Sequence, residues 1–501
     1  SRVFGTIFSI MACVGALYAY RQARTVELSA AFLYAGSSLG VVFAGDLLTL
    51  FVFWELMALG STLVLCSART PQAYKASVRY LLVHLFGGML LMVGIAAWAV
   101  TDGDLGLRVM TAALEGNNGK TVAAGFILAG VLLNAGAPPL SAWLPDAYPH
   151  ASPSGMVFLS AFTTKTAVYV LIRGFPGTEI LIFVGLYMVF YGIVYALMEN
   201  DMRRILAYSI INQVGFMVTG IGIGTEMALN GAAAHAFTHI IYKALLLMSA
   251  GGVLYMTGKR KCTDLGGLVQ TMPLTAVCGI IGALAISSFP LTSGFISKSM
   301  IAQSAADEHL ATVWILLAAA SAGVFLHAGI KFPWFVFFQK DSGLRAPDPP
   351  ANMCIAMSIF AVLCITLGVS PGVLYAMLPY SVDYAPYTGA HVVSQLQLLL
   401  FAGLAFFAML PMMKRTLTIS LDFDWFYRRF PRYVLTVVEP FFAGVLSAGR
   451  AMTRVGVRHS IEFVRRERLP NGFLVRSWPT GSMALWVMIM LLCYLVVYYF
   501  N

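Results

Sequence analysis

Long apolar segments separated by short polar ones make up most of this 501-residue chain. Each apolar segment has about 17–25 residues, the length that an α-helix needs to cross the hydrocarbon core of a bilayer. The pattern therefore predicts an all-α polytopic membrane protein with about fourteen transmembrane helices. We expect the spans at residues 3–20, 29–45, 47–66, 78–100, 122–144, 152–173, 178–198, 204–224, 229–257, 272–305, 310–335, 353–375, 395–413 and 482–500.

The loops between these segments alternate in charge. Residues such as Arg203 and Lys261 gather in every second loop, and residues such as Asp104 and Glu308 in the loops between them. By the positive-inside rule, the basic loops face the cytoplasm of a multi-pass protein in the cell (inner) membrane. The composition agrees, because only 11% of residues are charged, whereas a soluble protein has about 25%. The net charge of +10 then reflects membrane topology, so we expect contact with lipid and no binding of nucleic acid.

Prolines interrupt two of the predicted spans, at Pro138–Pro139 and at Pro290. Proline removes a backbone donor and clashes with the preceding helical turn. Backbone groups released at membrane depth survive only where protein or a watery cavity satisfies them, and such breaks in two halves of a transporter often mark its working centre. The two breaks are five spans apart. They predict two inverted five-helix repeats, at 29–177 and 178–340, although two unrelated proline kinks remain the alternative.

The rest of the chain divides around these repeats. Residues 1–28 form a first helix, and we expect further helices to precede it. Residues 341–414 are expected to hold two peripheral helices, and 481–501 a last transmembrane helix. The arginine-rich segment 415–480 predicts a helix along the cytoplasmic membrane surface, which either straps a neighbouring subunit or lies on anionic lipid.

Ionisable side chains lie at four places inside the apolar spans. These are Glu55, Lys165, Lys298 and the group His235, His239 and Lys243. A charge at mid-bilayer costs several kcal/mol, so these positions indicate a route for protons or ions. The last three are spaced four residues apart, which places them on one helical face as a ladder that can pass protons. A lone buried carboxylate needs a nearby cation, and Lys165 is the expected partner of Glu55.

Further candidates have plainer alternatives. His84 lies in the fourth span and is as well explained by packing, and His327 with Lys331 forms another pair four residues apart. Lys243 and Lys331 could instead extend to the membrane surface. The seven cysteines show no paired spacing with each other or with histidine, so no metal site is expected, and no cofactor signature is present.

Six strings of this sequence resemble, in order, the antiporter-like subunits of respiratory complex I and of multi-subunit Mrp-type cation/proton antiporters. They are FVFWELMAL (51–59), PPLSAWLPDAYPHASPSG (138–155), TTKTAVYVLIR (163–173), RRILAYSIINQVGF (203–216), HAFTHIIYKALLLMSAG (235–251) and FPLTSGFISKSMI (289–301). RYLLVHLFGG (79–88) and HAGIKFPWFVFF (327–338) are most similar to the D-type Mrp subunit. The resemblance covers nearly the whole chain up to about residue 340.

The resemblance implies a proton path through the middle of the membrane. Glu55 would be the acidic gate of the first half, Lys165 the central relay and Lys298 the lysine of the second half. His235, His239 and Lys243 match the hydrated central axis of the family.

One position departs from the family pattern. Members usually carry a lysine five residues before the proline of PLxxWLP, where this chain has Asn134. An amide cannot relay by changing charge, which puts the usual Glu–Lys switch in doubt. Glu55 then pairs with Lys165 or His84, or the first half conducts differently or not at all. By the repeat, Lys298 is expected to occupy the equivalent place in the second half.

These observations favour a proton-translocating subunit of a multi-subunit cation (Na⁺ or K⁺)/proton antiporter, which acts with partner subunits and is not itself an enzyme. One alternative is a proton-channel subunit of a complex I-like or membrane hydrogenase redox complex. A non-conducting scaffold subunit is the other. No flavin, quinone or iron–sulfur signature lies in this chain, so any redox chemistry would belong to other subunits.

Overall fold

The computed structural model describes residues 1–116, 118–411 and 479–500, together with a few residues between 436 and 465. In this part of the chain the regular structure is helical, and the only strand-like contacts are two isolated bridges between single residues. Twelve helices are long and apolar enough to cross a membrane. They are α1 (Arg2–Ala19), α2 (Thr25–Phe43), α3 (Leu47–Cys66), α4 (Pro71–Asp102), α8 with α9 (Pro153–Gly174), α10 (Ile180–Met198), α11 (Met202–Ile223), α12 (Glu226–Thr257), α15 with the π-helical turns after it (Ala311–Phe338), α16 (Ala351–Val369), α18 (Gly389–Met409) and α21 (Thr480–Phe500). The predicted all-α membrane protein is confirmed.

Shorter helices complete the fold. They are α5 (Thr111–Leu114), α6 (Gly119–Ala135), α7 (Trp143–Ala147), α13 (Pro273–Ile286), α14 (Ser293–Asp307) and α17 (Gly372–Tyr375), with 3₁₀ turns at Tyr148–His150, Cys262–Asp264 and Leu268–Gln270. The predicted spans 122–144 and 272–305 are not single helices, because both end early at their prolines. A count of fourteen complete crossings is therefore not confirmed.

Both helix breaks lie where the prolines predict them. At the first break, α6 ends at Ala135. Gly136 follows in a left-handed conformation (φ 84°), and Pro138 and Pro139 come after it. In the second case α13 ends at Ile286, and α14 begins only at Ser293. Each break leaves helix-terminal carbonyl groups without partners inside their own helix.

Side-chain caps fix where several other helices begin. Asp46 accepts a hydrogen bond from the backbone N–H of Thr49 (2.8 Å) at the start of α3, and Asp201 caps α11 in the same way. Thr70 and Thr225 cap α4 and α12. An oxygen-bearing side chain at this position satisfies one of the unpaired donors of the first turn. The polar loop residues of the sequence thus set the ends of the apolar spans.

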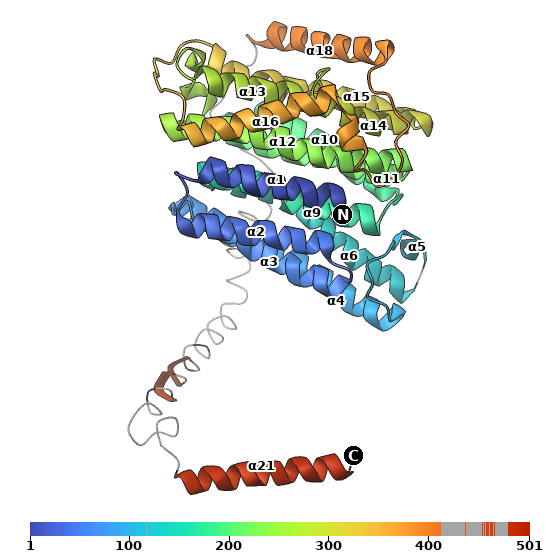
Figure 1. The fold of residues 1–501 in the computed structure, drawn as a ribbon, viewed down its shortest axis with the longest axis vertical. Helices are drawn as coiled ribbons and strands as arrows, with labels where there is room; N and C mark the ends of the chain where they lie inside the picture. Colours follow the sequence, from blue (N-terminus) through green and yellow to red (C-terminus); the bar gives the residue numbers. More distant parts are fainter. Residues whose placement is uncertain are drawn as a thin grey trace. The chain divides into compact units, whose positions relative to one another are not determined.

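The helix α12 is the centre of the bundle. It packs against α1, α8, α9, α11, α13, α14 and α16, and its residues from Ala228 to Val253 are all buried (Figure 1). Figure 1 also shows α1 between α2 and the group formed by α12 and α16, and α1 contacts all three. Side chains on α12 are consequently shielded from lipid by other helices on every side.

Buried arginine connects α11 to the start of α8. The guanidinium group of Arg203 donates to the carbonyl oxygens of Pro149 (3.1 Å), Ala151 (2.7 Å) and Ser152 (2.8 Å). The neighbouring imidazole of His150 is largely buried, which disfavours its charged form. Several arginines nearby disfavour it further, and together these effects lower the pKa of His150 to about 4. His150 is therefore neutral at pH 7, and Arg203 holds this corner by its carbonyl contacts.

A bidentate ion pair holds α4 to α7 at the same end of the bundle. Arg79 donates from Nε to one carboxylate oxygen of Asp146 (2.7 Å) and from Nη2 to the other (2.9 Å). The side chain of Asp146 is only 4% exposed, whereas that of Arg79 is 32% exposed. The pair gives a buried carboxylate its strongest donors.

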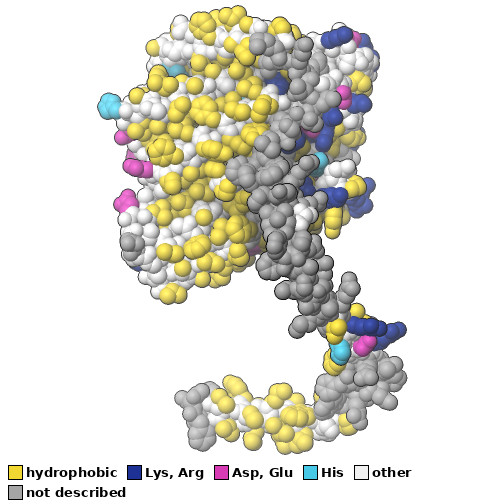
Figure 2. All heavy atoms as spheres, turned by 180° about the vertical axis from the view of Figure 1, so that it is seen from behind, with side chains coloured by type: hydrophobic (Ala, Val, Ile, Leu, Met, Phe, Trp, Pro, Cys, Tyr) yellow, Lys and Arg dark blue, Asp and Glu magenta, His cyan; other side chains and the backbone are white. Residues whose placement is uncertain are grey.

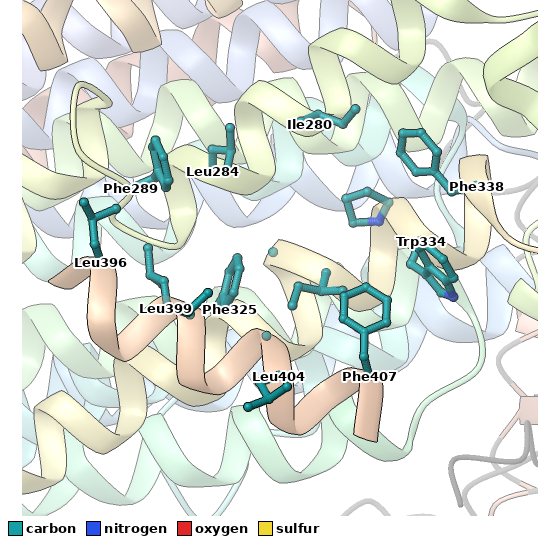
Figure 3. Close-up of a pocket in the computed structure, with 15 residues that line it drawn as sticks. Ile280, Leu284, Phe289, Phe325, Trp334, Phe338, Leu396, Leu399, Leu404 and Phe407 are labelled. Atoms are coloured by element: carbon teal, nitrogen blue, oxygen red, sulfur yellow. The ribbon is translucent and has the colours of Figure 1, made fainter. Parts of the chain in front are cut away.

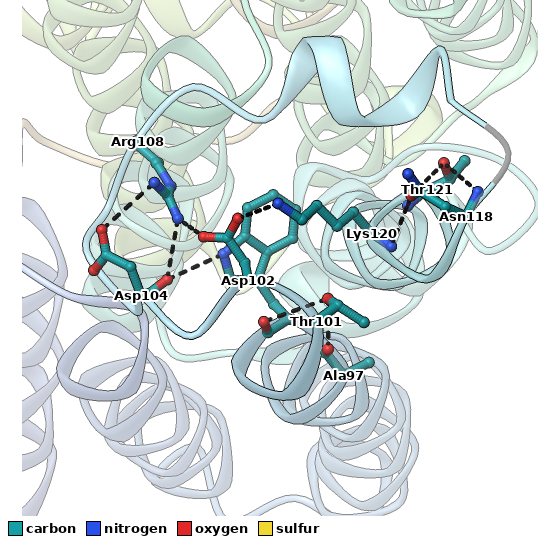
Figure 4. A network of polar contacts seen from close by, with 9 residues as sticks. Ala97, Thr101, Asp102, Asp104, Arg108, Asn118, Lys120 and Thr121 are labelled. Carbon is teal, nitrogen blue, oxygen red and sulfur yellow. Dashed lines mark hydrogen bonds and ion pairs between the residues drawn. The ribbon is translucent and has the colours of Figure 1, made fainter.

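The loop between α4 and α6 carries both signs of charge. Figure 4 shows Arg108 between Asp102 and Asp104, and Lys120 Nζ lies 2.6 Å from the carboxylate of Asp102. The two basic residues of this mainly acidic loop are therefore neutralised by its own carboxylates. They do not disturb the alternation of loop charge.

The surface shows the same segregation of charge. Figure 2 shows a broad hydrophobic face, with Asp and Glu on one rim and most of the Lys and Arg, together with some further Asp and Glu, along the opposite rim. An apolar face between two charged rims fits a protein that crosses a bilayer. The placement of the basic rim in the cytoplasm stays a prediction.

The helix α18 packs loosely on the bundle, and its buried residues are Leu399, Ala402 and Phe406. An apolar groove of about 670 Å³ lies between α18, α13 and the π-helical turns (Figure 3). Figure 3 shows Phe289 and Phe325 pointing into this groove from the bundle side. Every residue that lines the groove is apolar, which suits the hydrocarbon region of a membrane.

Residues 425–501 form a separate unit. Within it α21 confirms the last predicted transmembrane helix. Most of the segment 415–480, with its predicted surface helix, lies outside the described residues. That helix therefore stays a prediction.

Replacing Arg79 with alanine should lower the stability of the protein, because Asp146 then loses two charge-assisted hydrogen bonds while it stays buried. We expect a loss of about 1–3 kcal/mol, seen as a lower midpoint of thermal unfolding in detergent. The control is Arg345→Ala, which removes an exposed pair with Asp341 (side chains 51% and 44% exposed) and should leave the midpoint unchanged. Equal shifts for the two variants would contradict this account.

Candidate functional site

Three of the predicted residues form a buried ladder on α12. His235, His239 and Lys243 lie on one helical face, and all three side chains have no exposed surface. The rings of His235 and His239 are 6.1 Å apart between centroids. The spacing inferred from the sequence therefore gives the expected column at the centre of the bundle.

His235 belongs to a continuous hydrogen-bond network. Its Nδ1 lies 3.0 Å from the hydroxyl of Ser297, which also bonds the hydroxyl of Thr238 (2.9 Å). Its Nε2 lies 3.2 Å from the side-chain oxygen of Gln213, and the hydroxyl of Tyr242 donates to the same oxygen (3.1 Å). Groups from α11, α12 and α14 thus meet at this imidazole.

His239 has no such partners. Both ring nitrogens are buried, and neither forms a hydrogen bond within the described residues. Lys243, one turn further along α12, donates from Nζ to the hydroxyl of Ser209 (2.8 Å) and to the carbonyl of Leu206 (3.4 Å). Buried polar atoms are usually hydrogen-bonded, so the two nitrogens of His239 are exceptions among the described residues.

Lys165 lies at a helix interruption that the sequence does not reveal. The span 153–174 is interrupted at Phe162, which divides it into α8 (Pro153–Ala161) and α9 (Thr163–Gly174). Lys165 donates from Nζ to the carbonyl of Ser160 (2.6 Å) and to the hydroxyl of Thr164 (3.0 Å). The amine therefore binds the carbonyl end of α8 and has no exposed surface.

The hydroxyl of Tyr34 bridges the same interruption. It accepts a hydrogen bond from the backbone N–H of Thr163 (2.8 Å) and lies 3.4 Å from the carbonyl of Leu159. A tyrosine of α2 and the lysine of α9 together satisfy backbone groups that the interruption releases. This contact explains how an irregular helix persists at the centre of an apolar bundle.

The expected pair between Glu55 and Lys165 is wrong. Among the described residues no ion pair or hydrogen bond joins Glu55 to any side chain, and Lys165 uses a carbonyl and a hydroxyl instead. The carboxylate lies against α4, where a Cβ added to Gly88 would overlap its oxygen. Only glycine leaves room for the carboxylate at this point of α4.

Two further candidates lie beside Glu55 along α4. The amide of Asn134 lies against Gly87 from the side of α6, and both of its polar atoms are buried without partners. His84 donates from Nδ1 to the carbonyl of Tyr80 (2.9 Å), and its Nε2 is buried without a partner. The alternative pairing of Glu55 with His84 is therefore not made directly either. Glu55, Asn134 and His84 are called the first-half cluster here because all three lie on or against α4, and each has a buried polar atom without a partner among the described residues.

Lys298 lies beyond the second helix break. Its Nζ donates to the carbonyl of Ile286 (2.7 Å), the last residue of α13, and lies 4.9 Å from the ring centre of Phe216. The expected equivalence of Lys298 and Asn134 is wrong, because Asn134 precedes its break on α6 whereas Lys298 follows its break on α14. The sequence alone did not show this difference, because the distance of each residue from the nearest proline does not tell on which side of the break its helix lies.

His327 and Lys331 lie in a π-helical turn, Phe325–Lys331. His327 bonds the carbonyl of Gly323 (2.8 Å) through Nδ1, and its buried Nε2 has no partner. Lys331 Nζ donates to the carbonyls of Ala196, Leu197 and Glu199, at distances of 3.1, 2.5 and 2.6 Å. Lys331 therefore binds the carbonyl end of α10. The alternative that it extends toward the membrane surface stays a prediction.

Sequence reasoning did not identify four residues that complete the site. They are Tyr34, Gln213, Tyr242 and Ser297. Gln213 offered the clearest signal, as a polar residue in an apolar span. Within the described residues no group of three or more His, Cys, Asp or Glu side chains is placed to hold a metal ion.

Comparisons with known proteins agree with this arrangement. The family model of the NADH:quinone oxidoreductase/Mrp antiporter transmembrane region matches residues 44–325. The D-type subunit of the Na(+)/H(+) antiporter of Alkalihalophilus pseudofirmus is 32% identical over 351 residues, which cover 67% of this chain and 71% of that protein. The N-type subunit of the NADH-quinone oxidoreductase of Desulforudis audaxviator is 30% identical over 385 residues, covering 70% and 76%.

Two solved structures share the fold. A chain of the Mrp complex from Dietzia sp. DQ12-45-1b matches with a TM-score of 0.69 and 21% identity, over 75% of this chain and 82% of that one. A chain of the membrane-bound sulfane sulfur reductase, an archaeal respiratory membrane complex, matches with a TM-score of 0.70 and 24% identity, over 99% and 88%.

Tyr34→Phe should destabilise the protein, because the N–H of Thr163 loses its acceptor at a buried helix interruption. We expect a cost of about 1–3 kcal/mol, measured as a lower thermal midpoint in detergent. Tyr74→Phe is the matched control, since Tyr74 is 66% exposed and should tolerate the change. An unchanged midpoint for Tyr34→Phe would show that the hydroxyl does not support the interruption.

Proposed function

Because this chain belongs to the NADH:quinone oxidoreductase/Mrp antiporter transmembrane family, we propose that it is the proton-translocating subunit of a multi-subunit cation/proton antiporter. In this proposal it is a transport subunit and not itself an enzyme, and Na⁺ or K⁺ is exchanged by the complex. The carrying observation is the column of lysine and histidine side chains that lies fully buried at the centre of the bundle.

The chemistry of the column supports proton transfer. Lys165, Lys243 and Lys298 donate to carbonyl or hydroxyl oxygens, and none of them forms an ion pair within the described residues. A proton on one amine therefore lacks a carboxylate to hold it, and it repels a proton on the next. Such groups exchange protons readily when water or an imidazole connects them.

Buried polar atoms without a hydrogen-bond partner mark where water could connect the protonatable side chains. The described residues with such atoms include Glu55, His84 and Asn134 in the first-half cluster, then Thr166 of α9, and His239 on α12. Because these atoms lack a partner among the described residues, we propose that water occupies these places and continues the path from Glu55 to the ladder of His235, His239 and Lys243. Glu55 is the acidic gate, Lys165 the relay into the column, and Lys298 its far end.

Asn134 and the remaining candidates have lesser roles in this proposal. Asn134 and His84 hold water beside Glu55, and His327 borders the path through its open Nε2. Lys331 lies outside the path, because three carbonyl groups at the end of α10 hold its amine.

We also propose that residues 29–177 and 178–340 are inverted repeats. Matching loop contacts support this division. Asp46 pairs with Gly106, and Asp201 pairs with Lys261, so that each bridge joins residues 60 positions apart. Both aspartates also cap the helix that follows them, which makes α3 and α11 equivalent elements.

One observation favours a second function. The chain of the sulfane sulfur reductase complex matches 99% of this chain, whereas the Mrp chain matches 75%. The alternative is therefore that redox chemistry in partner subunits drives the same path. Purification of the complex with its native partners separates antiport from the redox-driven function. Flavin or iron–sulfur absorbance in the purified assembly would favour the redox-driven function.

Lys165→Ala should lower cation-driven proton flux at least about tenfold, because the path loses the only amine of α9. The measurement uses a pH-sensitive dye in everted membrane vesicles that contain the assembled complex, with Na⁺ and K⁺ added in turn. Lys340→Ala, in an exposed loop, should transport normally. Full flux in Lys165→Ala at normal expression would remove Lys165 from the path.

Gly88→Ala should lower the flux in the same direction as Glu55→Gln, because the added methyl group displaces the carboxylate from α4. In a Glu55→Gln background, Gly88→Ala should have little further effect, since the acidic group is already gone. Gly125→Ala is the control, because no atom lies within 4 Å of the added methyl group. Independent, multiplicative losses in the double variant would contradict a shared cause.

A further inference from the structure

A pocket with both polar and apolar walls lies beside Lys298. A pocket of about 270 Å³ opens between α11, α14, α15, α18 and the loop before α18. Lys298 lines its inner end, although only 4% of that side chain is exposed, and Gln303 lines it five residues further along α14, about 7 Å nearer the end of the helix. The pocket therefore leads from the break toward one end of the membrane spans.

The wall that α18 contributes is polar only at its beginning. His391, Ser394 and Gln395 lie on one helical face and line the pocket, whereas the later residues of α18 line the apolar groove of Figure 3. Gln395 also donates to the carbonyl of Ser287 in the second break (3.3 Å). A lipid-facing helix has no need of this polar face, so it requires a separate explanation.

His391 is oriented for proton exchange. Its Nδ1 donates to the carbonyl of Pro386 (2.8 Å), and its ring stacks on Phe295 of α14 with centroids 4.5 Å apart. A neutral imidazole whose Nδ1 carries the proton presents Nε2 as an acceptor. The carbonyl thus fixes the tautomer, and the stacked ring holds Nε2 in the wall of the pocket.

We propose that this pocket is a water-filled vestibule and that His391 passes protons between the exterior and Lys298. The inference rests on the proposed function and extends it to α18, a helix that carries none of the predicted site residues. The titratable groups that line the pocket with His391 are Lys298 of α14 and Tyr384 of the preceding loop, and α11 and α15 contribute none. Tyr387 of the same loop stacks on Phe295, the ring on which His391 also stacks.

Hydration of the pocket is tested without reference to transport. Ser394→Cys, in vesicles of the assembled complex, should react with a charged, membrane-impermeant thiol reagent beyond the labelling of the parent chain. Leu400→Cys on the lipid-facing side of α18 should not react, although Leu400 is 72% exposed. No labelling of Ser394→Cys would overturn the vestibule.

The role of His391 is tested by transport. His391→Gln should slow proton flux about five- to tenfold, most strongly at alkaline pH outside, where protons are scarce and a collecting group matters most. His391→Glu keeps a titrating group and should retain a larger share of the flux. His309→Asn, an exposed histidine at the end of α14, is the matched control and should transport normally.

The outcomes separate this inference from the proposed function. Loss of flux in Lys165→Ala with full flux in His391→Gln at every pH would overturn the role of His391 and leave the antiporter proposal standing. Equal losses in His391→Gln and His391→Glu would also overturn it, because packing on Phe295 would then be the only role. Full flux in both Lys165→Ala and Lys298→Ala would instead overturn the proposed function.

Discussion

The architecture depends on amines that are satisfied by the carbonyl ends of interrupted helices. Lys165 binds the carbonyl of Ser160 at the end of α8, and Lys298 binds that of Ile286 at the end of α13. Lys331 does the same at the end of α10. A helix that stops inside a membrane leaves carbonyl groups without donors and a partial negative charge at its C-terminus. An ammonium group meets both needs, and the helix end in turn tolerates a buried cation.

This reciprocity connects helix geometry with charge. A carbonyl end holds an amine by hydrogen bonds whether or not the amine is charged, but a charged amine gains more from the helix dipole. The charge state of each amine therefore affects how strongly the helix end is held. His235 of α12 has its own hydrogen bonds to Gln213 and Ser297. Within the described residues these lysines are held without a carboxylate beside them.

The first half of the molecule uses a different arrangement. Glu55 faces Gly88 of α4 without a protein partner, and the family's usual lysine is replaced by Asn134. The carboxylate, the amide and the imidazole of His84 lie on or against α4, and each has a buried polar atom that no described residue satisfies. Around the second break there is a lysine on α14 and, beside it, a pocket with polar and apolar walls. Aspartates cap both α3 and α11, yet the ionisable groups near the two breaks occupy different positions.

The sequence by itself determined the features that depend on local pattern. Apolar length predicted the membrane spans, prolines predicted both breaks, and a spacing of four residues predicted the ladder of His235, His239 and Lys243. The sequence did not predict the contacts of the buried lysines. Every residue carries a backbone carbonyl, so residue type does not identify those of Ser160 and Ile286 as the acceptors. The helix interruption at Phe162 contains no proline, so the sequence does not predict it. The sequence predicted an ion pair between Glu55 and Lys165 because it shows the charged side chains but not the backbone carbonyls that can bind them. Which groups meet across helices was decided by tertiary packing, since it brings together residues more than a hundred positions apart, such as Tyr34 and Thr163.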